Sequence, residues 1–274
     1  MKTFLTKFSW TLGVSRLRQL ADPPQHRVSF RILTGPIAFL LAWYLITALR
    51  FVDPFLVPGP VAVFSTLVKL CTAKEFWGDL VATLYRVAVS FGIATIFGVP
   101  LGLLLGSSRK LYGYSELLID FFRSIPATAL FPLFLLLFGI GDSGKIAVTI
   151  FSSALIILFN TAHGVLHAKK ARLLAARIMG ATPWQTFRGI LFWESLPQTF
   201  VGLRSAISLS LIIIIVTEMF IGSTSGLGHQ IIDFQITYEI PSMYAVIIIV
   251  GLLGYVLNLG FALLEKHFLH WSGK

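Results

Sequence analysis

The chain has 274 residues, of which 56% are hydrophobic and only 12% are charged, and its formal net charge is +10. An average globular domain is about 25% charged, so this composition argues against a soluble globule. Long unbroken apolar runs favour membrane-spanning helices over the alternating strands of a β-barrel. The sequence therefore predicts an all-α, polytopic membrane protein.

Apolar windows of about 20 residues predict six transmembrane helices. In chain order they cover residues 32–49, 80–106, 117–140, 146–163, 196–221 and 243–264. Nothing repeats at a period of about 20 to 50 residues, so we expect one membrane domain, 32–265. The flanks, 1–31 and 266–274, are predicted to be cytoplasmic tails. A weak amphipathic stripe in the first tail leaves a surface helix and a flexible segment both open, and we expect no cleaved signal peptide there.

Basic residues alternate between the predicted loops. Fifteen of the 22 Lys and Arg residues lie in the terminal segments and in the loops after the second and fourth helices, while four lie in the opposite loops. The positive-inside rule then places both termini in the cytoplasm. Because membrane orientation accounts for the basic charge, no nucleic-acid partner is predicted.

The longest cytoplasmic loop, residues 168–195, has a helical pattern, and we call it the coupling segment. Ala171, Leu174, Ala175 and Ile178 follow i, i+3, i+4 and i+7 spacing, which predicts an amphipathic helix. Gly180 is suited to a left-handed C-cap that ends it. From the residues alone, a loop resting on lipid headgroups and a docking surface for a partner are equally open.

A second short helix is expected directly after Gly180. Thr182 suits the N-cap and Pro183 the first helical position. Gln185 stands where its side chain can return to the N-cap backbone, which completes a capping box. The coupling segment is therefore predicted to consist of two short helices joined by a glycine elbow.

The run from Ala175 to Gln185 (AARIMGATPWQ), followed by Ile190 and Leu196-Pro197, resembles the Glu-Ala-Ala loop of importer permeases of the ATP-binding-cassette (ABC) class. The resemblance extends over about 57–265 and is nearest to the nitrate, sulfonate, taurine and bicarbonate branch. Leu174 occupies the position of the family's Glu, and Trp193 that of a family Pro. Supporting motifs are TLYRV from Thr83, PLGLLLG from Pro100, RSIP from Arg123, FGIG from Phe138, Glu218-Met219 and GLG from Gly226.

The resemblance implies a type I importer permease fold in the bacterial inner membrane, in which cytoplasmic coupling helices between helices 4 and 5 enter a cleft of an ATPase subunit. It also implies a pair of permease subunits, two ATPase subunits and an extracytoplasmic solute-binding protein, which would dock on external loops that include 222–242. The chain itself is then not an enzyme and binds no cofactor, because ATP and Mg²⁺ belong to the partner ATPase. The residues placed at the ATPase contact are Ala171, Leu174, Ala175, Ala176, Arg177, Met179, Gly180, Ala181, Thr182 and Gln185.

The expected cargo is a small anion, such as nitrate or bicarbonate, or an organosulfonate such as taurine. A neutral or heterocyclic nutrient, such as a vitamin precursor, is the alternative within the same class. A secondary transporter is less favoured because no inverted repeat is visible. A membrane enzyme is also less favoured, because the acidic residues mostly lie singly in loops. No set of candidate catalytic residues, such as paired acids or a cluster of His and carboxylates, is visible in the sequence.

Charged residues inside the predicted spans are costly and so are candidates for function. At helical rise, Arg86 and Glu218 lie about 9 and 4.5 Å from the outer ends of their spans, which predicts an ion pair near an external gate. Arg123 and Arg204 lie about 9 and 12 Å from the cytoplasmic ends. Both could reach headgroups, or could line a path for a small oxyanion. Asn160 could line the path or bond a neighbouring helix.

Three further patterns have ordinary interpretations. The run from Gly139 to Lys145 resembles a phosphate-binding loop but lacks its final Ser or Thr, so we expect an external turn. Gly98, Gly102 and Gly106 share a helical face, which predicts close helix packing. His163 and His167 have the spacing of helical metal ligands, but no carboxylate or cysteine accompanies them, so no metal site is predicted.

Overall fold

The structure, a computed structural model, describes residues 31–220 and 223–269. It contains two compact units divided after Pro60. Most of the predicted N-terminal tail (1–31) and the end of the predicted C-terminal tail (270–274) lie outside the described residues, as do positions 221 and 222. The described residues of each unit are helical with connecting turns.

Unit 1 contains α2 (Arg31–Ala48), which matches the first predicted span to within one residue at each end. Its part from Thr34 to Ala48 is apolar but shorter than a full membrane span. The indole of Trp43 donates a hydrogen bond to the carbonyl oxygen of Pro58 at 3.1 Å, which closes the turn after the helix. This bond satisfies the polar end of a large aromatic side chain.

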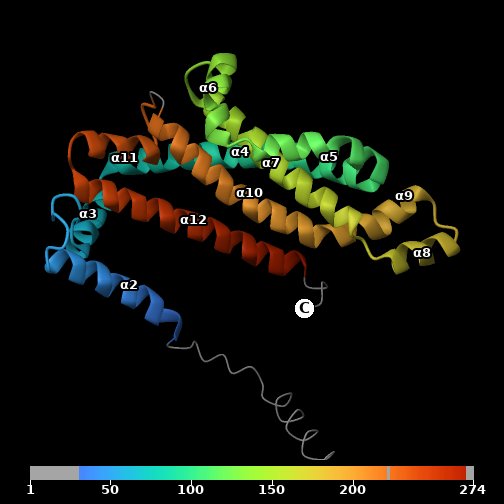
Figure 1. Ribbon diagram of the computed structural model, residues 1–274, viewed down its shortest axis with the longest axis horizontal. Helices are drawn as coiled ribbons and strands as arrows, with labels where there is room; N and C mark the ends of the chain where they lie inside the picture. The colour runs from blue at the N-terminus through green and yellow to red at the C-terminus, as the bar shows by residue number, and fades with distance from the viewer. Residues whose placement is uncertain (1–30, 221–222, 270–274) are drawn as a thin grey trace, which may run out of the picture. The chain divides into compact units, whose positions relative to one another are not determined.

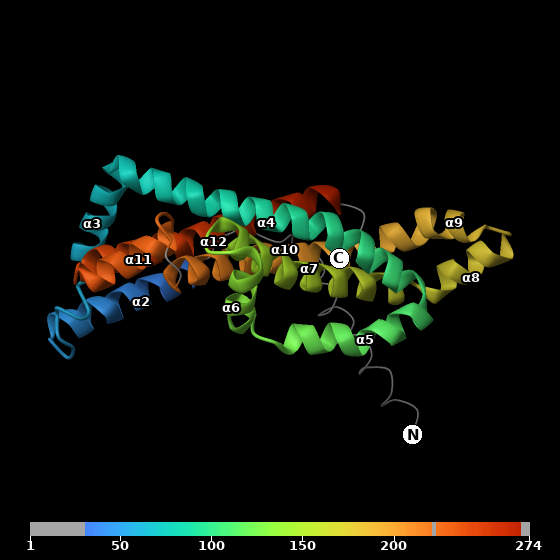
Figure 2. The same cartoon turned by 90° about the horizontal axis from the view of Figure 1, so that it is seen from above.

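Unit 2 contains the remaining helices. Its long ones are α4 (Lys74–Ser107), α7 (Asp142–Leu166), α10 (Phe192–Phe220) and α12 (Ile240–Phe268). Helix α7 packs against α4 and α10, while α12 packs against α10 and α11 (Leu227–Ile236), as Figures 1 and 2 show. The shorter helices are α3 (Pro60–Thr72), α5 (Arg109–Ser124), α6 (Ala127–Phe138), α8 (Lys170–Ile178) and α9 (Pro183–Thr186).

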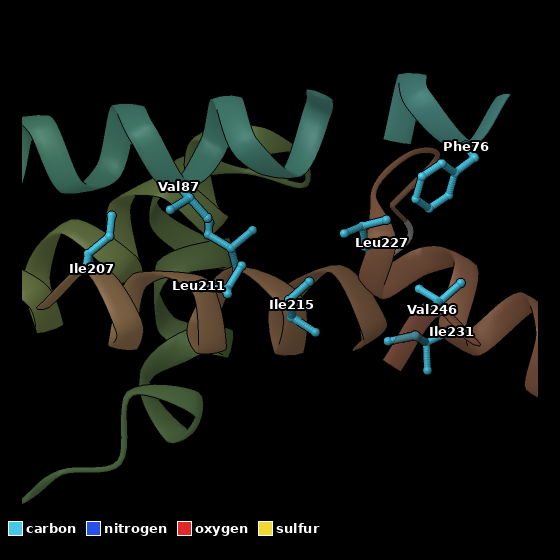
Figure 3. Close-up of a cluster of buried hydrophobic side chains, with 9 residues drawn as sticks. Phe76, Val87, Ile207, Leu211, Ile215, Leu227, Ile231 and Val246 are labelled. Carbon is cyan, nitrogen blue, oxygen red and sulfur yellow. The ribbon is translucent and has the colours of Figure 1, made fainter. Parts of the chain in front are cut away.

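The main apolar core of unit 2 lies where α4, α10, α11 and α12 meet (Figure 3). Val87 of α4, Leu211 of α10 and Val246 of α12 are among its buried side chains. Leu227 and Ile231 seal the same cluster from α11, whose existence the sequence analysis did not anticipate. Burying an aliphatic side chain of this size removes it from water at a gain of about 1.5 to 3 kcal/mol.

The predicted glycine face packs against α7. A Cβ at Gly102 would lie 2.6 Å from the carbonyl oxygen of Leu158 and 2.7 Å from the Cβ of Thr161. At Gly98 and Gly106 an added Cβ would meet α7 at 2.9 Å and 2.7 Å. The packing role is therefore confirmed: three glycines in successive turns let the α4 and α7 backbones approach closely.

The third of the six predicted transmembrane helices is not a single helix. Among the described residues, four helices are long and apolar enough to cross a membrane, and a fifth crossing requires α5 and α6 to be counted as one span bent by 94°. The expected helix 117–140 is thus two helices. Ile125 is extended, with ψ 123°, because Pro126 disfavours a helical conformation at the residue before it.

The fifth predicted span also differs from its expected form. Helix α9 continues through a π-helical turn (Phe187–Leu191) into α10, so that residues 183–220 form one helical rod of 38 residues. The second short helix predicted for the coupling segment is therefore the first turn of the helical rod 183–220 and not a separate element. Its length at helical rise is about 57 Å.

Candidate functional site: a coupling segment and an ion network

The coupling segment begins with α8, and Gly180 ends this helix as predicted. Gly180 has φ +73°, the left-handed conformation that glycine adopts without steric cost. The Ala181 amide donates to the carbonyl oxygen of Ala176 at 3.0 Å, and the Gly180 amide donates to that of Arg177 at 3.1 Å. These two bonds form a Schellman motif, which satisfies the last carbonyl groups of the helix.

The start of α9 is the predicted capping box. The Gln185 amide donates to the Thr182 hydroxyl at 3.3 Å, and the Thr182 amide donates to Oε1 of Gln185 at 2.8 Å. Pro183 occupies the first helical position. Because both bonds join residues three positions apart, local chemistry alone fixes the start of α9.

Glu194 holds the beginning of α8 against this rod, and the sequence analysis missed it. One carboxylate oxygen accepts from Arg172 at 2.7 Å, and the other accepts from the Lys169 amide at 2.5 Å. The carboxylate of Glu194 is 11% exposed, whereas Arg172 is 60% exposed. The one signal in the sequence was an isolated acidic residue about 20 positions after the basic residues at the start of the predicted helix.

The apolar residues of the coupling segment lie on its outside. Leu174, Ile178, Met179 and Trp184 are each more than half exposed, whereas Ala176 is buried. Ala171, Ala175, Arg177, Thr182 and Gln185 are also exposed, and Ala181 is half-buried. The predicted contact residues thus mostly form an open, partly apolar surface at one end of unit 2 (Figure 1).

The predicted ion pair is present toward the other end of unit 2. Nη1 of Arg86 lies 2.6 Å from Oε1 of Glu218, and both side chains are at most 5% exposed. Arg86 also donates through Nε to Asp142 at 2.8 Å. Lys145, which is 2% exposed, lies 3.9 Å from the same Asp142 oxygen. We call Arg86, Asp142, Lys145 and Glu218 the ion network.

The carboxylate of Glu218 has additional neutral partners. It accepts from the Thr83 hydroxyl at 2.9 Å and from the Gly228 amide at 3.0 Å. Gly226 has φ +120°, and a Cβ there would lie 2.5 Å from Oε2 of Glu218. The two glycines of the GLG motif therefore leave room for a buried acid, since side chains at these positions would displace it.

The ion network, together with Asp79, ties the segment before α11 to α4 and α7. Arg86 of α4 donates to the Ser225 carbonyl oxygen at 2.9 Å, and Lys145 of α7 donates to the Ser223 hydroxyl at 2.7 Å. Asp79 of α4 accepts from the Gly226 amide at 2.6 Å. With two cations and two carboxylates, the network is neutral overall, which lowers the cost of burying its charges.

Asp142 and Lys145 come from the run that resembles a phosphate-binding loop. Gly139 and Gly141 have φ +81° and +145°, and they form the predicted turn between α6 and α7. The lysine donates to Ser223 and the aspartate accepts from Arg86. Sequence reasoning assigned no role to these residues, because their partners lie 56 or more positions away in the chain.

The three predicted pathway residues lie on different helices and make separate contacts. Arg123 of α5 donates to Asp120 at 3.3 Å and lies 3.7 Å from the centre of the Phe159 ring. Its expected depth assumed a straight helix 117–140, which the bend after α5 contradicts. Asn160 of α7 accepts from Gln198 of α10 at 3.0 Å, so it bonds a neighbouring helix.

Arg204 of α10 is exposed and donates through Nε to Oδ1 of Asn258 of α12 at 3.1 Å. The two histidines are close to each other: Nδ1 of His167 lies 2.9 Å from the carbonyl oxygen of His163.

Residues 98–270 match the family described as binding-protein-dependent transport system inner membrane component. A probable ABC transporter permease protein of Brucella abortus is 30% identical over 84% of this chain and 90% of its own length. The taurine transport system permease protein TauC of Escherichia coli is 26% identical over 88% of this chain and 89% of its own.

A chain of the inward-facing methionine ABC transporter MetNI superimposes with a TM-score of 0.60 at 23% identity, over 75% of this chain and 97% of that chain. The alginate ABC transporter structure gives 0.54 at 15% identity, over 94% and 93%. These likenesses show the fold. With the family match over most of its length, the chain belongs to the inner membrane components of binding-protein-dependent ABC transport systems and is a permease subunit.

Proposed function

We propose that this permease moves its solute with energy from a separate ATPase, whose movement enters the chain through the coupling segment. The observation that carries the proposal is the exposed elbow of α8 and α9, which continues without interruption into the rod 183–220. A push on Trp184 acts directly on a helix of full membrane length, and a push on Met179 reaches this helix through the elbow. The mechanism needs no flexible connection between the docking surface and the membrane.

The surface chemistry favours a protein partner over bare lipid headgroups. Leu174 and Met179 are exposed apolar side chains, and Gly180 fixes the turn that presents the second of them. An apolar patch beside charged side chains is typical of a docking surface. Leu174 replaces the family's Glu, so we propose an apolar contact at that position of the ATPase cleft.

The proposed assembly has two copies of this chain enclosing the path, two ATPases on the cytoplasmic side and a solute-binding protein outside. Both termini and the coupling segment face the cytoplasm in this arrangement, as the asymmetry of Lys and Arg supports. The ion network then lies toward the outer side. There it would hold the segment 223–230 to α4, α7 and α10, and act as the outer gate when its bonds break.

The proposed solute is a small anion or an organosulfonate. The relatives include permeases named for taurine and for aliphatic sulfonates, from Escherichia coli and Bacillus subtilis. A relative from Halalkalibacterium halodurans is named for formylaminopyrimidine, which supports a neutral heterocyclic nutrient as the second candidate.

Co-purification with a candidate partner ATPase tests the proposal. We expect the wild-type pair to elute together and Gly180→Val to abolish the complex, because valine is strained at φ +73° although open space surrounds the position. Gly113→Val is the matched control, since Gly113 also has open space but ordinary φ. Solute accumulation by the permease alone in vesicles without an ATPase would contradict the proposal.

A further inference from the structure

A row of polar side chains follows the outward faces of α10 and α12. The two helices line a hollow of about 400 Å³. Its lining contains one cation, one carboxylate, two hydroxyl groups and one amide, with a single apolar side chain. These residues are Arg204, Ser205, Ser208, Asn258, Glu265 and Val201.

Contact between this polar surface and lipid tails would be energetically unfavourable. Arg204 and Ser205 are exposed within an apolar helix, two turns or more from either end of the rod 183–220. Charged and amide side chains inside a membrane generally face water-filled cavities or other protein groups, because hydrocarbon cannot replace their hydrogen bonds. The lining of the hollow therefore fits water or polar groups better than lipid tails.

The direction of the helices brings the two opposite charges toward each other. Helices α10 and α12 are packed side by side, and both are connected to α11 at the same end, so they run antiparallel (Figure 1). Helical side chains incline toward the N-terminus of their own helix. Arg204 on α10 and Glu265 on α12 thus incline toward each other along the hollow.

Arg204 is already oriented by its neighbours. Its Nε donates to Oδ1 of Asn258 at 3.1 Å, and Nδ2 of that amide donates to the Ser208 hydroxyl at 2.5 Å. This chain of bonds fixes the guanidinium plane and uses one edge of it. The terminal Nη atoms form no hydrogen bond within the described structure, and planar N–H pairs of this kind bind oxyanions in a bidentate manner.

Glu265 lies at the other end of the hollow. It is seven residues after Asn258, which is about 10.5 Å along the helix axis. Arg204 and Glu265 form no ion pair with each other in the described structure. One hollow therefore presents a guanidinium and a separate carboxylate, with room for a small molecule between them.

We propose that this hollow is a solute-binding site selective for small zwitterions with an oxyanion at one end and an ammonium at the other, such as 2-aminoethanesulfonate. Arg204 binds the sulfonate group and Glu265 the ammonium. A plain inorganic anion uses only half of the site and is repelled by Glu265. This inference rests on the proposed importer function and narrows its cargo.

Thiol labelling tests whether water fills the hollow, and its result does not depend on transport activity. In a Cys71→Ser background of the permease–ATPase complex, we expect Ser205→Cys to react with a charged, membrane-impermeant thiosulfonate, and 2-aminoethanesulfonate to slow the reaction. Leu263→Cys is the control: this exposed apolar position of α12 lies on another face and should stay unlabelled. Absence of labelling at position 205, or labelling that 2-aminoethanesulfonate does not slow, overturns the site.

Reconstituted transport tests the selectivity. The complex with its own binding protein, supplied at saturating solute, is compared on 2-aminoethanesulfonate and on ethanesulfonate, which lacks the ammonium. We expect wild type to prefer the zwitterion and Glu265→Gln to reduce that preference by about tenfold, the order of one charge-assisted bond. Arg204→Gln should slow uptake of both, Arg204→Lys should restore part of it, and Lys266→Gln, one position outside the lining, should change neither.

The outcomes separate the two proposals. Absence of ATP-driven uptake of any solute by a correctly assembled wild-type complex contradicts the importer function itself. Uptake with no preference for the zwitterion, or with a preference that Glu265→Gln leaves intact, overturns the zwitterion site alone. Uptake of both sulfonates that is unaffected in Arg204→Gln overturns the anion-binding role of Arg204.

Discussion

The coupling segment and the ion network, toward opposite ends of the same helical unit, are stabilised in opposite ways. In the coupling segment the cap and elbow bonds join residues at most five positions apart, and the apolar side chains are exposed. In the ion network the bonds that Arg86 makes to Asp142, Glu218 and Ser225 join residues 56 to 139 positions apart. Arg86, Lys145 and Glu218 are buried. The cap and the elbow can therefore form from local bonds, whereas the buried polar cluster depends on the packing of the whole unit.

The rod 183–220 connects the two regions. Glu194 near its beginning holds α8, and Glu218 near its end holds Arg86 and the Gly228 amide. The two carboxylates are 24 residues apart, about 36 Å at helical rise. One continuous helix carries both carboxylates, and the π-helical turn is its one irregularity. In the proposed mechanism, movement at the elbow would therefore reach the ion network through this helix.

The largest effect is expected from Arg86→Met. This change leaves Glu218 buried without its cationic partner, and loss of one partner of a buried pair costs about 3 to 5 kcal/mol. We expect the melting temperature of the purified permease in detergent to fall by on the order of 10 °C. Arg109→Met removes a charge that lies outside the network and should leave the melting temperature nearly unchanged.

The double variant Arg86→Met with Glu218→Gln sharpens this result. Removing both charges avoids an unpaired buried carboxylate, so the double variant should be more stable than Arg86→Met alone. The melting temperature of the double variant could instead equal the value obtained by adding the effects of the two single variants. The interaction energy between Arg86 and Glu218 would then be zero, and their ion pair would not contribute to stability.

The coupling segment was largely predictable because its signals are local. Thr182, Pro183 and Gln185 define a cap within four residues, and Gly180 supplies the left-handed turn. The contact of Arg86 with Glu218 was also predicted, because two charges at similar depth in apolar helices have few other partners. These features follow from sequence distance or membrane depth alone.

The rest depended on long-range packing. The return of the turn 139–141 toward Ser223 brings Asp142 and Lys145 to Arg86, and no pattern within the sequence reports that proximity. Pro126 was a signal for the bend between α5 and α6. Hydropathy averaged over a window of residues does not detect such a bend, because both sides of it are included in one window. Continuity of α9 with α10 was missed because the basic loop suggested a separate element, whereas the π-helical turn preserves the helix.

An intermediate effect is expected at the helix contact between the two regions. Gly102→Ala places a Cβ 2.6 Å from the Leu158 carbonyl oxygen, so α4 and α7 must separate. Overpacking of this kind costs about 1 to 3 kcal/mol. Gly92→Ala on the same helix meets nothing within 4 Å and should be neutral or stabilising by about 0.5 to 1 kcal/mol. Equal melting temperatures of the two variants would show that the close approach of α4 and α7 has no energetic weight.

A smaller effect is expected from Thr182→Ala. Loss of an N-cap hydroxyl costs about 1 kcal/mol, and here the loss is confined to the first turn of α9. The melting temperature should therefore hardly change, while the affinity for the partner ATPase falls. Thr186→Ala, which removes a hydroxyl bonded to the Thr182 carbonyl one turn later, is the control and should bind the ATPase more tightly than Thr182→Ala.

The smallest effect on stability is expected from Glu194→Gln. The carboxylate pairs with Arg172, which is 60% exposed, so solvent screening limits the contribution of the pair to below about 1 kcal/mol. The glutamine side chain retains an oxygen that can accept a hydrogen bond from the Lys169 amide, so the beginning of α8 should keep its position. If α8 must be held rigidly against the rod to transmit force, ATP-driven transport should nevertheless fall in this variant while its melting temperature stays within about 2 °C of wild type. Equal transport by Glu194→Gln and wild type would mean that the elbow at Gly180, and not the ion pair at the base of α8, carries the force.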